Sequence, residues 1–169
     1  GGVSSVYDPL DVAEFTMEEI EAAVDAAEDF NTYVAVHVMT DRAIRKCIEA
    51  GVKSIEHGYF ASDETLQLMA KQGVWLDPQP MFEGDLEFPD AERSAKFKLA
   101  TDATAEIYTK AKQFGVKISF GSDLLFNPPS ENQGAQLARL GTWYSPYEVL
   151  KIGTSQNADL LELSGPRHP

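Results

Sequence analysis

Amphipathic segments alternate with short apolar runs along most of the chain. The apolar runs are rich in β-branched and aromatic residues, and four of them fall at residues 33–37, 52–57, 74–77 and 116–120. Runs of this composition are typical of strands buried on both faces of a parallel sheet. Their alternation with amphipathic segments predicts successive βα units.

The segments between these runs have the apolar spacing of helices. The first helix is expected to begin near Thr16, because residues 16–19 form a capping box, and to end near Phe30. The remaining helices are expected over residues 41–50, 63–71, 90–113, 133–140, 145–153 and 157–163. Residues 79–89, with two prolines and a glycine, are expected to form a long loop of the kind that shapes substrate pockets.

Three expected helices end in a glycine that is followed at once by valine, at Gly51-Val52, Gly73-Val74 and Gly115-Val116. Glycine readily takes the left-handed backbone conformation that closes a helix, so each pair predicts a turn from helix to strand. Four strands with intervening helices amount to half of an eight-stranded parallel (β/α) barrel of the TIM type. The predicted class is therefore α/β, with a partial barrel of about four βα units. An open four-stranded sheet is the alternative for the isolated chain.

Composition narrows the possible partners. A chain of 169 residues with 43% hydrophobic residues predicts a single domain over residues 1–169. The formal net charge of −13 argues against nucleic acid or an anionic membrane surface as a partner. The single cysteine, Cys47, excludes an intrachain disulfide, and the sequence shows neither a signal peptide nor a membrane-spanning stretch. We therefore expect a cytoplasmic protein.

Candidate chemistry gathers at the carboxyl ends of the expected strands. His37 and His57 each end such a run, and Asp123 follows another. Side chains at these ends converge on one mouth of a barrel, and two imidazoles with a carboxylate suit zinc or a similar divalent ion. Taken singly, each residue has an ordinary structural explanation, as a hydrogen-bonded histidine or a turn-forming aspartate. Their presence on one rim predicts a metal site.

Other residues near these candidates also have predicted roles. Tyr59, Gln79 and Phe82 are expected to contact substrate, although aromatic packing against the neighbouring helix is the more ordinary role for Tyr59. Strand alternation directs Glu56 to the face opposite His57, so a structural role is expected. His168 is expected to be a solvated residue of the tail.

Short motifs in a fixed order carry a resemblance to a known family. They are Val36-His37, Ser54-Ile55-Glu56-His57-Gly58, Gly121-Ser122-Asp123 and Thr154-Ser155-Gln156-Asn157-Ala158 with Leu160-Leu161. Together they resemble the amidohydrolase superfamily, in its imidazolonepropionase-like and prolidase-like branch. The resemblance spans essentially the whole chain.

The resemblance implies a metal-dependent hydrolase that cleaves C–N bonds through a metal-activated water, on small amides or on dipeptides such as those ending in proline. By motif match, His37, His57 and Asp123 correspond to the ligands from the fifth, sixth and eighth strands of the family barrel. Asp123 also corresponds to the general base. The implied cofactor is a divalent metal, with zinc expected, as one or two ions.

The sequence departs from the family in lacking a His-x-His pair, since its only histidines are His37, His57 and His168. Residues 1–4 resemble the segment after the fourth strand, so the family's bridging lysine is expected just upstream of this chain. We therefore expect the carboxyl-terminal half of the barrel. The alternative is a catalytically incomplete fragment that needs a homo-oligomer or a complementary barrel half, because unpaired sheet edges favour association.

Overall fold

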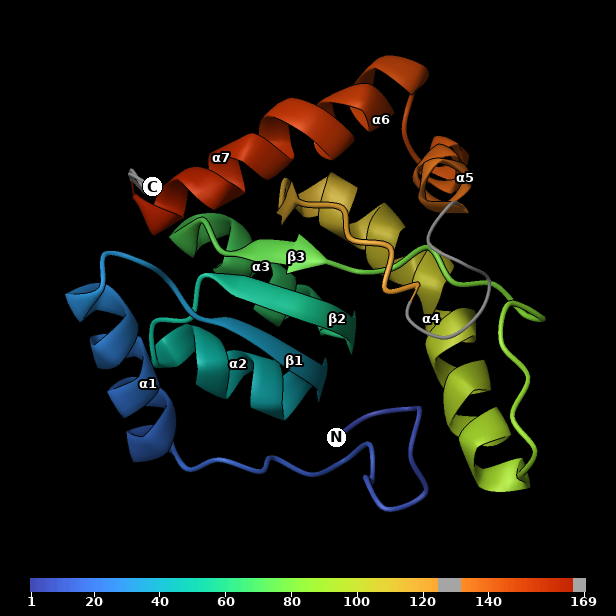
Figure 1. Cartoon of the computed structure of the whole chain (residues 1–169), viewed down its shortest axis with the longest axis horizontal. Coiled ribbons are helices and arrows are strands. Elements are labelled where there is room, and N and C mark those ends of the chain that lie inside the picture. Colours follow the sequence, from blue (N-terminus) through green and yellow to red (C-terminus); the bar gives the residue numbers. More distant parts are fainter. Residues whose placement is uncertain (125–131, 166–169) are drawn as a thin grey trace.

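A four-stranded sheet with helices on one face forms the centre of the molecule (Figure 1). The computed structural model describes residues 1–124 and 132–165. The strands lie side by side in chain order, and each neighbouring pair is parallel. They are β1 (Ala35–Thr40), β2 (Ser54–Phe60), β3 (Trp75–Asp77) and β4 (Lys117–Ile118). This order of successive parallel neighbours confirms the predicted part of a (β/α) barrel.

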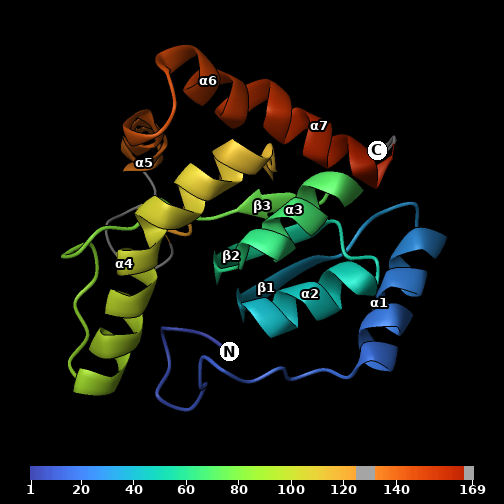
Figure 2. The same ribbon diagram turned by 180° about the vertical axis from the view of Figure 1, so that it is seen from behind.

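A helix connects each strand to the next, as the sequence predicts. These helices are α2 (Asp41–Glu49), α3 (Asp63–Gln72) and α4 (Ala91–Phe114). The expected glycines close them: Gly73 and Gly115 cap α3 and α4 with φ of 70° and 72°, and Gly51 follows α2 with φ of 99°. Seen from behind in Figure 2, the three helices cover one face of the sheet.

The first helix, α1 (Met17–Asp29), precedes β1 and starts at the predicted capping box. Thr16 Oγ1 accepts a hydrogen bond from the Glu19 amide at 3.3 Å, and the Glu19 carboxylate accepts one from the Thr16 amide at 2.8 Å. These two bonds satisfy amide groups that a helix start otherwise leaves without partners.

The core fills the space between the sheet and its three covering helices. Its fully buried side chains include Ile44, Ile48, Ile55, Leu66, Met69, Leu76 and Tyr108. Apolar burial of this extent is the main force that holds β2 and β3 in place. The centre of the sheet is therefore a firm base for residues at its rim.

The first two strands run further than the sequence predicts. Val38 and Met39 are buried and extend β1 to Thr40, and β2 continues to Phe60, which pairs with Thr40 beyond an irregularity in register. His37 and His57 therefore lie within their strands and not at the last residue. Burial on both faces was also a wrong expectation for β1, because His37 is exposed.

The last strand is shorter than expected, because a side chain takes the place of a neighbouring strand. The amide of Phe120 donates to Asn157 Oδ1 at 2.9 Å, and its carbonyl accepts from Asn157 Nδ2 at 2.9 Å. Both backbone groups of Phe120 are thus occupied from outside the sheet. The expected strand over residues 116–120 is reduced to Lys117–Ile118.

The tail is helical but more continuous than predicted (Figure 1). Gly153 does not end a helix, since a π-helical turn joins the two segments on either side of it. A Cβ at Gly153 would lie 2.8 Å from Leu137 Cδ2, so close packing accounts for the glycine. The tail elements are α5 (Gln133–Arg139), η2 (Leu140–Thr142), α6 (Pro146–Lys151), the π turn η3 (Ile152–Gln156), α7 (Asn157–Leu161) and η4 (Glu162–Ser164).

Cys47 is a free thiol buried in the core. Over residues 1–124 and 132–165, no helix combines the length and the apolar character needed to cross a bilayer. His168 lies outside the described residues.

Candidate metal site and active site

Two of the predicted ligands, His37 and His57, lie against each other at the rim of the sheet. Their strands are neighbours, and in the register His37 is opposite Glu56 while His57 is opposite Val38. The ring centroids are 4.4 Å apart and the ring planes meet edge to face at 76°. With regular alternation this register would put the two rings on opposite faces of the sheet. They meet, although they stand 20 residues apart in the sequence, where His57 departs from regular strand backbone.

The backbone at His57 has an uncommon conformation. His57 has φ of 69°, and Gly58 follows with φ of 60°. A Cβ at Gly58 would lie 2.6 Å from Leu76 Cδ1, so a larger residue would clash with the core. Left-handed conformations at residues other than glycine are costly and are often found at functional sites.

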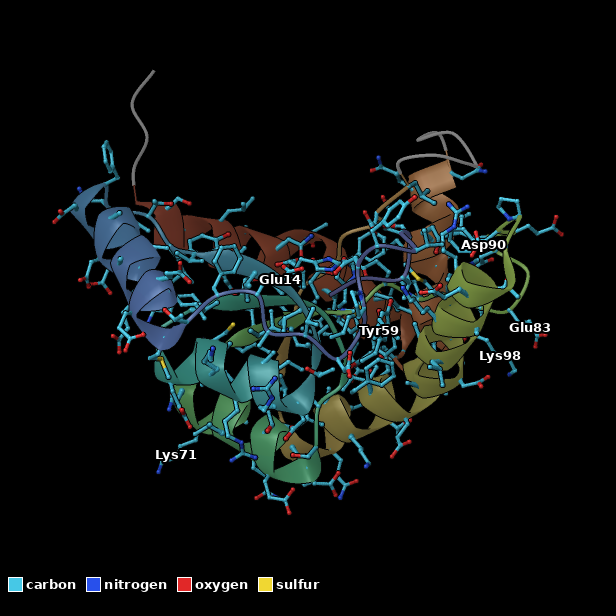
Figure 3. The ribbon with its side chains drawn as sticks, turned by 90° about the horizontal axis from the view of Figure 1, so that it is seen from below. Glu14, Tyr59, Lys71, Glu83, Asp90 and Lys98 are labelled. Atoms are coloured by element: carbon cyan, nitrogen blue, oxygen red, sulfur yellow. The ribbon has the colours of Figure 1, made fainter. Side chains whose placement is uncertain are left out.

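The ring of His57 is buried and hydrogen-bonded. Its Nδ1 lies 2.5 Å from Gln79 Oε1, and the Tyr59 hydroxyl donates to the Gln79 backbone carbonyl at 2.9 Å. Tyr59 and Gln79 are each only 4% exposed. Figure 3 shows Tyr59 close to α4, the helix that packs against β2. Tyr59 and Gln79 are thus buried next to His57, and their contact with substrate stays a prediction.

Phe82, the third predicted substrate contact, lies in the loop after β3 and is half-buried. Its ring stacks on Trp143 with centroids 5.9 Å apart, and the Arg139 guanidinium lies 5.2 Å from the Phe82 centroid. Asp85 binds the same guanidinium at 2.9 Å. The expected long loop is thus tied to the tail by aromatic and ionic contacts, and the substrate role of Phe82 also stays a prediction.

Asp123 lies beyond the end of β4, exposed, with φ of 50°. Its turn is attached to the sheet through Asp77, whose Oδ1 accepts a hydrogen bond from the Gly121 amide at 2.8 Å. The Asp123 carboxylate acts electrostatically on Glu56, His57 and Asp77, so it lies at the same rim. In the part of the chain that the structure describes, however, no three His, Cys, Asp or Glu side chains are close enough to hold a metal ion. The structure thus joins the two histidines but not all three predicted ligands.

Burial governs the charge states at this rim. It lowers the pKa of His57, and the nearby His37 ring acts in the same direction, which favours the neutral imidazole that a metal requires. Burial also raises the pKa of Glu56, which accepts a hydrogen bond from Ser54 Oγ at 2.7 Å. Burial and the neighbouring Glu56 raise the pKa of Asp77 to about 7. A neutral imidazole at His57, beside carboxyl groups that raise the pKa of one another, is a suitable environment for a divalent cation.

Sequence reasoning missed Asp77 and Asn157 as members of this rim. Asp77 ends β3, and thus has the same position after an apolar run that singled out the histidines. Asn157 stands in the tail motif, but its contact with Phe120 spans 37 residues and has no local signal. Both residues form hydrogen bonds with the backbone of the turn that leads to Asp123.

Comparison with known proteins agrees with this architecture of a parallel sheet with candidate ligands at its rim. The amidohydrolase family matches residues 1–165, and the chain belongs to this family. The chain is 32% identical to ochratoxinase from Aspergillus niger over 174 residues, which covers 100% of the chain and 35% of ochratoxinase. It therefore spans about a third of the length of this curated relative.

Two solved structures are similar over nearly the whole chain. One is a crystal structure of an amidohydrolase, with 33% identity and a TM-score of 0.87 over 96% of this chain and 41% of that protein. The other is a prolidase complexed with N-methylphosphonate-L-proline, with 31% identity and a TM-score of 0.86 over 98% of this chain and 42% of the prolidase. Their similarity supports the assignment of the four strands to one part of a larger barrel.

Proposed function

We propose that this chain carries part of the active site of a metal-dependent hydrolase that cleaves C–N bonds in small amides or dipeptides. The observation that carries the proposal is the pair of adjacent imidazoles, His37 and His57, on neighbouring parallel strands of an amidohydrolase-family chain. Active sites of (β/α) barrels lie at this rim of the sheet.

Each rim residue has a distinct part in the proposed site. His37, His57 and Asp123 are the metal ligands supplied by this chain, and zinc is the expected ion, as one or two per complete site. A divalent cation, when bound there, lowers the pKa of water and polarises the amide carbonyl. Asp123 acts as the general base that accepts the proton of the attacking water and passes it to the departing amine.

For the substrate we propose a small amide or a dipeptide that ends in proline. The prolidase that binds N-methylphosphonate-L-proline supports this class, as does the amidohydrolase to which the chain is similar. Phe82, in the long loop after β3, is our proposed apolar contact to such a substrate, and its ring is half-buried against Trp143.

The direct test is to measure zinc binding by the purified, folded chain with titration and elemental analysis. We expect stoichiometric zinc that is lost in His37→Ala, His57→Ala and Asp123→Ala. Asp25→Ala, which removes an exposed carboxylate from α1, is the matched control and should bind zinc as the unaltered chain does. A folded chain that binds no zinc would contradict the proposal for this chain.

A second candidate is that the chain forms a working site only with a complementary barrel half or as a homo-oligomer. Two observations favour this candidate. His37 is exposed, and among residues 1–124 and 132–165 Asp123 belongs to no group of three possible ligands. Hydrolysis of proline dipeptides by the zinc-loaded chain, measured over a range of protein concentrations, separates the two. Activity proportional to concentration supports a self-sufficient chain, and a steeper dependence supports assembly.

A further inference from the structure

The side-chain amide of Gln79 is held in one orientation by a backbone carbonyl oxygen, which can accept a hydrogen bond but cannot donate one. Its Nε2 donates to the backbone oxygen of Asp77 at 3.1 Å. If the amide were turned over, Gln79 Oε1 would face that oxygen, and two acceptors would repel each other. The amide nitrogen therefore belongs on the side of Asp77, and Oε1 belongs on the side of His57.

Tyr59 supports the same orientation. Its hydroxyl donates to the Gln79 backbone carbonyl at 2.9 Å and lies 3.3 Å from Gln79 Oε1, which accepts from it. Both side chains are almost fully buried, so water cannot easily replace these bonds. An unpaired polar group in such a place is costly, typically by about 1–3 kcal/mol. The amide oxygen of Gln79 is thus a fixed acceptor.

A fixed acceptor beside a histidine selects the tautomer. Because Gln79 Oε1 lies 2.5 Å from His57 Nδ1, this nitrogen must carry the proton when the ring is neutral. The lone pair of His57 is then on Nε2. His37 has the opposite arrangement, since its Nε2 lies 2.8 Å from the carbonyl oxygen of Gly1, and an oxygen of this kind requires Nε2–H.

We propose that Gln79 is a positioning residue: supported by Tyr59 and Asp77, it holds His57 as the Nδ1–H tautomer and so reserves Nε2 for the metal. Only the assignment of Nε2 to a metal rests on the proposed function. The tautomer itself is a property of the metal-free chain. Outer partners of this kind fix the ring orientation and raise the affinity of a metal site by about 10–100-fold.

The first measurement is nitrogen-15 NMR of the metal-free chain at a pH where His57 is neutral, with signals assigned by single-histidine replacements. We expect a proton on Nδ1 of His57. In Gln79→Leu the ring should shift towards the Nε2–H form, and zinc affinity should fall about tenfold or more. Gln79→Glu, with its buried carboxyl group protonated, keeps a donor for the Asp77 carbonyl and an acceptor for His57, and should keep the Nδ1–H form.

Gln136 offers a matched control, because it is another buried glutamine, on α5. Gln136→Leu should leave the tautomer of His57 unchanged, whatever it does to stability. Two results would overturn the inference. One is a proton on Nε2 of His57 in the unaltered chain, and the other is a His57 tautomer that stays the same in Gln79→Leu. A Gln79-dependent Nδ1–H tautomer in a chain that binds no zinc would support this inference and would count against the proposed function.

Discussion

His57 and Asp123 are two predicted ligands with left-handed backbones, but the molecule holds them in different ways. His57 lies inside β2, is buried, and contacts side chains from β2 and from the segment that follows β3. Asp123 is exposed beyond β4, and among the described residues its neighbours Phe120 and Gly121 attach this turn to other elements. Changes near His57 should therefore affect folding and the site together. Changes at Asp123 should affect the site alone.

The largest effect is expected at Gly58, beside His57. Gly58→Ala places a Cβ 2.6 Å from Leu76 Cδ1 at a residue with φ of 60°, which combines a clash with backbone strain. We expect the free energy of unfolding to fall by about 3 kcal/mol or more, measured by urea denaturation. Gly134→Ala, in α5 with open space around its Cα, is the control and should be neutral or stabilising. Equal losses in the two variants would show that the core does not constrain the His57 turn.

A smaller effect is expected from the protonation of Asp77. Its pKa is raised from 3.8 to about 7, so the folded state holds a proton that the unfolded state has lost. The free energy of unfolding of the metal-free chain should therefore fall as pH rises from about 4 to about 7, by a few kcal/mol. Asp77→Asn keeps an acceptor for the Gly121 amide and should flatten this slope. Denaturation curves across that pH range test the prediction, and an unchanged slope in the variant would refute it.

Asn157→Ala should have a moderate effect, because it removes both hydrogen bonds to the backbone of Phe120. We expect a loss of about 1–2 kcal/mol in thermal or chemical unfolding, together with weaker zinc binding through the loosened Asp123 turn. Asn157→Asp keeps the acceptor and loses the donor, so its loss of stability should lie between that of Asn157→Ala and none. Full zinc affinity in Asn157→Ala would show that the turn does not depend on the tail.

The smallest effect on stability is expected at Asp123 itself. Asp123→Ala removes an exposed carboxylate, so the free energy of unfolding should change by no more than about 0.5 kcal/mol. Zinc affinity should nevertheless fall, because a proposed ligand is lost. Calorimetric titration beside a melting curve separates the two readouts. A large loss of stability with unchanged zinc binding would reverse the contrast drawn between His57 and Asp123.

Much of the fold could be predicted because its signals are local. The capping box at Thr16 and the glycines that end α3 and α4 act within one turn of chain, and the structure confirms them. Strand ends were predicted less well, since β1 and β2 continue as long as their partners extend. The end of β4 depends on Asn157, which is distant in the sequence.

By itself, the sequence determined the alternation of strands and helices, the family motifs and the residue types available for chemistry. Only the tertiary structure decided which of these residues meet: it set the rings of His37 and His57 4.4 Å apart, aligned Gln79 with His57, and left Asp123 at the surface. The physical reason is the distance along the sequence between the residues that interact. Turns and caps are governed by bonds between near neighbours, whereas contacts at the rim depend on strand register and on side chains from remote segments.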